Sequence, residues 1–123
     1  MLQNVTSFKE LIVWQKGFKL CLLVYKVTGN FPKEEIYTLT AQIRRCCIPI
    51  PSNVAEGHAR HRRLEYIQFL RIAYGSAAEL ETQLLLSREL KYIDEEEYIP
   101  IMQLLEEVQK MLNSIIGRLK KGL

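Results

Sequence analysis

The sequence predicts an all-α protein, an antiparallel up-and-down four-helix bundle whose second helix is interrupted by prolines. Apolar residues recur at steps of three and four along most of the 123 residues, and no alternation of period two is long enough to indicate a strand. Helix-breaking residues divide the chain into four such segments with short loops between them, which favours antiparallel neighbours. A chain of this length suits one domain, residues 1–123, with a single core.

The first helix is expected to begin near Ser7, because Glu10 follows three residues later in a capping-box pattern. Gly29 and Asn30 are expected to end it. One helical face, which we expect to point inward, carries Leu11, Trp14, Phe18, Cys21, Leu22 and Tyr25. A second apolar stripe lies on a separate arc and consists of Val13, Leu20, Leu23 and Val24. This stripe either widens the core of a single bundle or forms an interface between subunits.

The second helix is expected to start after Pro32, which suits a first helical turn. Pro49 and Pro51 each remove a backbone donor and crowd the preceding turn, so this helix must stop or kink there. Asn53 and Glu56 follow the prolines directly. We expect these two polar side chains to satisfy backbone groups that the interruption leaves without partners.

The third helix is expected to run from about Leu64 to Leu90. Its middle, residues 75–78, has little or no side chain, which lets a neighbouring helix approach closely. Asp94 and Glu97 repeat the capping pattern at the start of the fourth helix. The apolar residues of that helix alternate steps of four and three, as in a coiled coil. Pro100 lies about one turn inside it and predicts a kink or a later start.

Composition sets limits on compartment and covalent chemistry. No signal-peptide pattern opens the chain and no run approaches the roughly 18 apolar residues of a membrane span, so we expect a cytoplasmic protein with no membrane contact. Cys21, Cys46 and Cys47 are odd in number and lack CxxC spacing. This argues against a disulfide framework and a zinc site and favours small buried side chains.

Charge is unevenly distributed along the chain. Residues 1–75 carry 11 Lys and Arg against 5 Glu, a net charge of +6, whereas residues 76–123 carry 6 Lys and Arg against 9 Asp and Glu, a net charge of −3. Such asymmetry indicates either a basic surface for an anionic partner or complementary surfaces that meet between subunits.

The strongest candidate for a functional site is a basic segment after the prolines. Arginine forks bind phosphate oxygens in pairs, and a row of them releases the counterions condensed on nucleic acid. The candidate nucleic-acid-binding residues are Arg44, Arg45, His58, Arg60, His61, Arg62 and Arg63, with Lys16 and Lys19 of the first helix. The alternative is a solvated charged surface with ion pairs between subunits, and for the lysines alone this alternative is favoured. No aromatic residues interleave with the cluster, and no recognition-helix or zinc-finger pattern supports sequence-specific readout.

The sequence contains no recognisable catalytic or cofactor motif. His58 and His61 are three residues apart, but the arginines around them repel a cation, so we expect no bound metal. Glu79 and Glu81 lie on different sides of a helix and suit ion pairs better than acid–base chemistry. The glycines form neither a phosphate loop nor a dinucleotide motif. We therefore expect no enzymatic activity, no catalytic residues and no cofactor.

Several motifs in a fixed order carry a family resemblance. They are Trp14-Gln15-Lys16, Phe31-Pro32, residues 50–57 (IPSNVAEG) and residues 73–84 (AYGSAAELETQL). With these, the chain from about Phe8 to Leu119 resembles the four-helix bundle proteins encoded in intervening sequences of bacterial 23S ribosomal RNA genes. A related bundle is the accessory variability determinant of diversity-generating retroelements, whose oligomer engages nucleic acid and a reverse transcriptase.

The resemblance implies a ring-shaped homo-oligomer, most often a pentamer, and favours an interface role for Val13, Leu20, Leu23 and Val24. It also makes RNA or DNA the expected partner, with a reverse transcriptase as a further candidate partner. The leading hypothesis is a non-enzymatic oligomeric scaffold that binds RNA or DNA through a basic face. The alternative is a protein–protein interaction module that does not bind nucleic acid.

Overall fold

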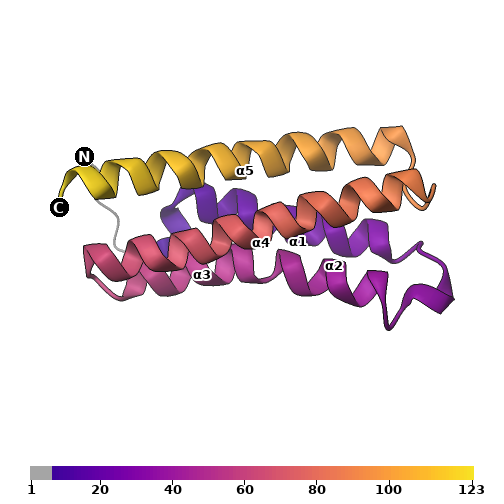
Figure 1. Ribbon diagram of the computed structural model, residues 1–123, viewed down its shortest axis with the longest axis horizontal. Coiled ribbons are helices and arrows are strands. Elements are labelled where there is room, and N and C mark those ends of the chain that lie inside the picture. The colour runs from indigo at the N-terminus through magenta and orange to yellow at the C-terminus, as the bar shows by residue number, and fades with distance from the viewer. Residues whose placement is uncertain (1–6) are drawn as a thin grey trace.

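The structure, a computed structural model, describes residues 7–123 and is a bundle of α-helices (Figure 1). Its α-helices are α1 (Ile12–Thr28), α2 (Leu39–Cys47), α3 (Pro49–Ala59), α4 (Arg63–Glu89) and α5 (Glu95–Lys121). Two short 3-10 helices, η1 (Phe8–Glu10) and η2 (Lys33–Glu35), precede α1 and α2. No strand occurs within residues 7–123. The predicted all-α class is confirmed, and α2 with α3 forms the interrupted second helix of the bundle.

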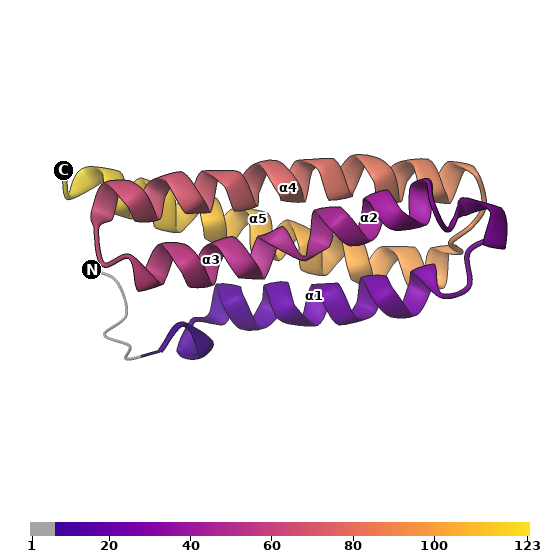
Figure 2. The ribbon, with the colours of Figure 1, turned by 90° about the horizontal axis from the view of Figure 1, so that it is seen from below.

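The four rods are arranged as a square. α2 and α3 follow one another along the same side of the molecule, with a bend between them (Figure 2). The α2–α3 rod contacts α1 and α4, and α5 contacts α1 and α4 from the opposite corner. α1 and α4 are the diagonal pair. The α3–α4 hairpin and the end of α5 therefore lie at one end of the bundle, and the α1–α2 and α4–α5 connections at the other (Figures 1 and 2).

The proline interruption is stabilised differently from the sequence prediction. Pro51 lacks the N–H that would bond to the Cys47 carbonyl, and the Cys21 thiol of α1 donates to that oxygen instead, at 3.1 Å. Asn53 Nδ2 does donate to the Pro49 carbonyl at 2.7 Å, as expected of a residue beside the interruption. Glu56 serves no backbone group and accepts from Arg60. Cys21 is thus a hydrogen-bonding residue as well as a small packing side chain.

The two apolar stripes of α1 have the opposite roles from those predicted. Val13, Leu20 and Val24 are buried in the core of the bundle, with exposed fractions of 3%, 0% and 0%, and Leu23 packs against that core. These residues therefore cannot form a surface between subunits. The other stripe points outward: Phe18, Leu22 and Tyr25 are 48%, 60% and 41% exposed. Trp14, partly buried, stacks on Phe18 with ring centroids 5.1 Å apart.

The helical period leaves the choice between the two stripes open. Each stripe repeats with helical spacing, so periodicity shows that two apolar faces exist but not which one meets the core. Gly17 lies on the arc that faces the core and packs directly against α3. A Cβ at Gly17 would stand 3.4 Å from the Ile50 side chain and 3.6 Å from Pro51. We call Trp14, Phe18, Leu22 and Tyr25 the outer stripe of α1.

A second close approach joins α3 to α4 at Gly57. A Cβ there would stand 2.8 Å from Phe69 Cβ and 3.0 Å from Tyr66 Cδ1. The prediction that Gly75 permits close packing in the middle of α4 is wrong, because Gly75 is exposed and nothing lies within 4 Å of a Cβ added to it. Its neighbours Ser76 and Ala77 are buried, so only part of that thin segment faces another helix.

The two predicted capping patterns are present, but the second helix starts later than predicted, since Pro32 precedes only η2 and α2 begins at Leu39. Ser7 and Glu10 form a complete capping box, which here starts η1 rather than α1 itself. Asp94 caps α5 by accepting from the Glu97 amide at 2.9 Å. α5 begins at Glu95 and continues through Pro100, so the later start does not occur. In the described part of the chain no helix combines the length and apolar character needed to cross a lipid bilayer.

Candidate nucleic-acid interface

The basic segment forms the tight hairpin between α3 and α4. Arg60 ends α3 in helical geometry, and Arg62 is extended with φ −120° and ψ 130°. Between them, His61 has φ 60°, the left-handed conformation that reverses the chain direction. α4 then begins at Arg63. Three arginines are therefore concentrated on a connection at one end of the molecule.

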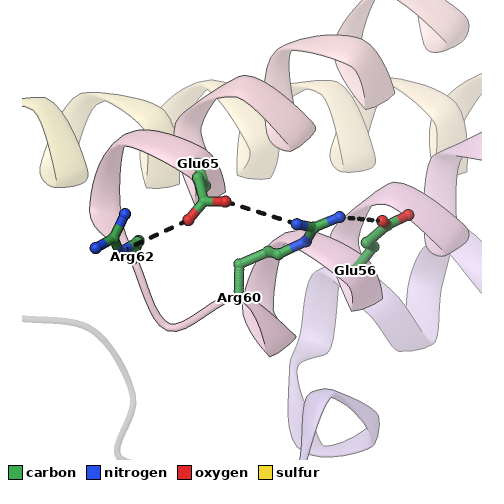
Figure 3. Close-up of polar contacts among 4 residues, drawn as sticks. All are labelled: Glu56, Arg60, Arg62 and Glu65. Atoms are coloured by element: carbon green, nitrogen blue, oxygen red, sulfur yellow. Dashed lines mark hydrogen bonds and ion pairs between the residues drawn. The ribbon is translucent and has the colours of Figure 1, made fainter.

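Ion pairs organise this hairpin (Figure 3). Arg60 Nη2 lies 2.9 Å from Glu56 Oε2 and Arg60 Nη1 lies 3.7 Å from Glu65 Oε1. The Glu56 carboxylate, which accepts this hydrogen bond, raises the pKa of Arg60 above its ordinary value. Glu65 Oε2 is 4.0 Å from Arg62 Nε, while the Arg62 side chain stays 81% exposed. Arg60 is thus already neutralised by carboxylates, whereas Arg62 projects into solvent.

His61 is the turn residue of the hairpin, and His58 lies in the last turn of α3 just before it. Their ring centroids are 6.5 Å apart, and His58 contacts the edge of the Tyr66 ring at 5.9 Å. His58 is half-buried and His61 is exposed. Within residues 7–123 no group of three or more His, Cys, Asp and Glu side chains is placed to hold a metal ion.

Arg44 and Arg45 lie apart from the hairpin. Arg45 and Arg60 are 15 positions apart, across the end of α2 and the whole of α3, which places them about 20 Å apart along the bundle. Arg44 is engaged locally: its Nε donates to Thr28 Oγ1 at 3.0 Å and its guanidinium lies 4.6 Å from the centre of the Tyr25 ring. Arg45 is exposed. The predicted set of arginines is therefore two separate groups.

The two candidate lysines of α1 also differ in their contacts. Lys16 forms an ion pair with Glu107 of α5, so it joins two helices of the bundle. Lys19 is exposed and forms no ion pair with any residue in 7–123. Of this pair, only Lys19 has a charge that the described structure leaves uncompensated.

Sequence reasoning missed the last turn of α5, which lies against the hairpin. A Cβ on Gly122 would fall 1.2 Å from Arg63 Nη1, so the Arg63 guanidinium occupies the space beside that glycine. Arg118, Lys120 and Lys121 are exposed on this part of α5. The signal was available, because an antiparallel bundle places the end of its last helix beside the start of the one before it.

The folded chain separates charge along its long axis. The hairpin and the end of α5 supply the basic end, as Figures 1 and 2 show from the positions of α3, α4 and the C-terminus. The opposite end carries the acidic residues of η2 and of the α4–α5 connection, which are Glu34, Glu35, Glu89, Asp94, Glu95, Glu96 and Glu97. The ends of the bundle therefore do not follow the two halves of the sequence, because the basic end includes Arg118, Lys120 and Lys121 of the second half and the acidic end includes Glu34 and Glu35 of the first.

Known proteins share both sequence features and the fold of this chain. Residues 9–114 match the family model described as 23S rRNA-intervening sequence protein. The chain belongs to this family. Among solved structures, it is similar to a protein with unknown function from the S23 ribosomal protein family of Bacteroides thetaiotaomicron VPI-5482. The identity is 27%, the TM-score is 0.79, and the match covers 85% of this chain and 98% of the other. A search of curated proteins found no match.

Membership confirms the resemblance read from the sequence motifs. The matched range includes the α3–α4 hairpin but ends before Arg118, Lys120 and Lys121. Neither the family description nor the structural neighbour states a reaction, a ligand or a partner for these positions.

Proposed function

We propose that this protein is a non-catalytic, oligomeric helical scaffold that binds RNA or DNA through its basic end. The observation that carries the proposal is the α3–α4 hairpin, which presents Arg62 with its side chain 81% exposed at an end of the bundle. The ion pairs of Glu65 fix the hairpin without covering this guanidinium. An exposed guanidinium on an ordered backbone can bind phosphate oxygens in pairs, and the gain offsets the roughly 0.5–1.5 kcal/mol that immobilising its side chain costs.

The expected partner follows from chemistry and family together. Guanidinium groups suit phosphates, and the family is named for 23S rRNA intervening sequences, which supports RNA. An accessory role beside a ribosomal RNA intervening sequence or a reverse transcriptase is the corresponding biological proposal. Binding is weakly selective in sequence, because contacts to phosphates position a protein without reading bases.

Self-association is part of the proposal, now through the outer stripe of α1. Phe18, Leu22 and Tyr25 expose three large side chains in a row on one face of a well-packed bundle. When another copy covers such a face, apolar surface is removed from water, and each Å² buried stabilises the complex by about 25 cal/mol. The family resemblance supports a ring, with a pentamer as the expected form.

Salt dependence of binding tests the nucleic-acid proposal. We expect log affinity for a DNA duplex to fall linearly with log salt, by about 0.9 for each phosphate contact. R62Q should reduce this slope by about one contact per subunit, whereas K33Q, at the acidic end, should leave it unchanged. Absence of binding to any RNA or DNA at low salt would refute the proposal.

The outer stripe also supports a second candidate function, a protein–protein interaction module without nucleic-acid binding. In that case the exposed apolar residues of α1 bind a different protein, and the basic end contributes ion pairs to it. Loss of partner binding in L22K, with no nucleic-acid binding by the unmodified protein, would favour this candidate.

A further inference from the structure

The last turn of α5 and the α3–α4 hairpin form one continuous basic surface. The Arg63 guanidinium lies beside Gly122, where a Cβ would fall 1.2 Å from Nη1 and 2.4 Å from Cζ. Arg118 precedes Gly122 by four residues and so lies on the same side of α5. Lys121 precedes Gly122 directly, and Lys120, whose side chain starts on the other side of α5, lies with it in the last turn of the helix.

The cations of this surface are uncompensated. Arg63, Arg118, Lys120 and Lys121 form no ion pair with any carboxylate in residues 7–123, whereas Arg60 and Arg62 share Glu56 and Glu65. Elsewhere in residues 7–123, Lys16 pairs with Glu107 and Arg88 with Glu89 and Glu95, whereas exposed cations such as Lys19 and Lys110 are also without an ion pair. What distinguishes the basic end is that unpaired cations of two helices, α4 and α5, meet there.

The helix dipoles favour the cations at the end of α5 but disfavour those at the start of α4. Cations in the last turn of α5 are favoured by the negative end of that helix. Arg62 and Arg63, however, stand at the N-cap and first position of α4, where the positive end of the helix disfavours them. Like charges on the two helices also repel one another. An anion bound between them would relieve both unfavourable terms.

We propose that Arg118, Lys120 and Lys121 complete, with Arg62 and Arg63, a two-sided site for the phosphates of a double-stranded nucleic acid. This inference rests on the proposed function and adds to it the second half of the site and the form of the ligand. The two halves come from separate helices, so the phosphates of a backbone passing over the end of the bundle contact both.

The ligand is double-stranded because the surface offers charge without stacking. The aromatic side chains near the hairpin are covered: Tyr66 is buried, and the Arg60 guanidinium lies 5.2 Å from the centre of the Phe69 ring. The exposed Phe and Tyr rings in the described chain are on α1, in the α1–α2 connection and at Tyr74 of α4, about three turns from the hairpin, so that the hairpin itself exposes only the small imidazole ring of His61. Single-strand binders depend on base stacking, whereas a duplex presents a charge every 1.7 Å or so.

The experiment compares three full-length variants with the unmodified protein, using a short DNA duplex, the same sequence as an RNA duplex and each single strand. R118Q/K120Q/K121Q removes the α5 half of the site, and R62Q/R63Q removes the hairpin half. K33Q/K91Q/K110Q removes three exposed charges elsewhere and is the matched control. Circular dichroism confirms the fold of each, and K120Q/K121Q replaces the triple variant if that one fails to fold.

We expect both site variants to reduce the slope of log affinity against log salt on DNA duplex, the α5 variant by up to about 2.7 per subunit at 0.9 per contact. The control should keep the slope. Duplexes should bind more tightly than single strands. If the α5 variant matches the control while R62Q/R63Q lowers the slope, the α5 half is refuted and the proposed function stands. Equal binding of single strands refutes the choice of ligand, and no binding at all refutes both proposals.

Discussion

Gly57 is the position where the structure makes the sharpest stability prediction. In Gly57→Ala the new Cβ would lie 2.8 Å from Phe69 Cβ, 3.0 Å from Tyr66 Cδ1 and 3.4 Å from the Tyr66 carbonyl oxygen. Favourable carbon–carbon contacts need about 3.5–4.0 Å, so α3 and α4 must move apart by up to roughly 1 Å. Phe69 cannot avoid the contact by rotating, since its Cβ is fixed to the backbone.

The magnitude follows from two opposing terms. Overpacking of this kind costs about 1–3 kcal/mol. Alanine in place of glycine within a helix returns about 0.5–1 kcal/mol through lower entropy of the unfolded chain. We expect Gly57→Ala to lower the free energy of unfolding by up to about 2.5 kcal/mol, the difference between these terms.

Gly75→Ala is the matched control, because it makes the same change in α4 where nothing lies within 4 Å of the new Cβ. It should raise the free energy of unfolding by about 0.5–1 kcal/mol. Urea denaturation at one fixed protein concentration measures both, since self-association would make stability depend on concentration. If both variants raise the midpoint equally, the close approach of α3 to α4 at Gly57 is wrong.

Four further predictions test other parts of the structure. C21A should cost about 1–3 kcal/mol by leaving the Cys47 carbonyl unsatisfied, and C21S should cost less because it keeps a donor; equal urea midpoints would contradict this. F18K/L22K should lower the molar mass in sedimentation while keeping the helical circular dichroism, whereas L20K, which buries a charge, should unfold the protein. The Thr38 hydroxyl, and after it the Tyr92 hydroxyl, lowers the pKa of Glu35 below 4.5, so this stabilisation exists at neutral pH and is lost as pH falls through the folded-state value. NMR titration should show the pKa of Glu35 rising in T38A and Y92F. Burial raises the pKa of the Cys46 thiol to about 11, so alkylation by iodoacetamide at pH 8 should be slow until the protein unfolds.

The sequence was sufficient for the elements of the fold because their signals are local. The capping residues Ser7 and Asp94 lie within a few positions of the amides that they bind. The interruption at Pro49 needs only the missing N–H of proline. The orientation of α1 was not predictable in this way, because both of its stripes satisfy helical periodicity. The stripe that is buried is in contact with residues distant in sequence, such as Ile50, which lies 33 positions from Gly17.

The candidate site was predicted in part for the same reason. The arginines of the hairpin are adjacent in sequence and remain together in the structure. Arg44 and Arg45 are only slightly farther away in sequence, but the rigid α3 places them about 20 Å from the hairpin. The end of α5 lies more than 50 residues away and returns to the hairpin because the bundle is antiparallel. Closeness in sequence thus led to the inclusion of Arg44 and Arg45, which lie apart from the hairpin. Distance in sequence concealed the basic residues at the end of α5, which lie beside it.

Because the outer stripe lies along α1, the way in which copies pack through it determines where their basic ends lie. Nucleic-acid binding can therefore distinguish one arrangement of subunits from another. α1 runs along the bundle, so copies that meet through its outer stripe with parallel axes would place every basic end on the same side of the assembly. A two-fold pairing with antiparallel axes would place them on opposite sides. In the parallel ring, contacts of neighbouring subunits to one duplex act together by effective concentration. F18K/L22K should then weaken duplex binding far more than loss of any phosphate contact explains, while leaving the slope per subunit unchanged. An antiparallel pair would lose little affinity on dissociation, because one duplex cannot reach both ends.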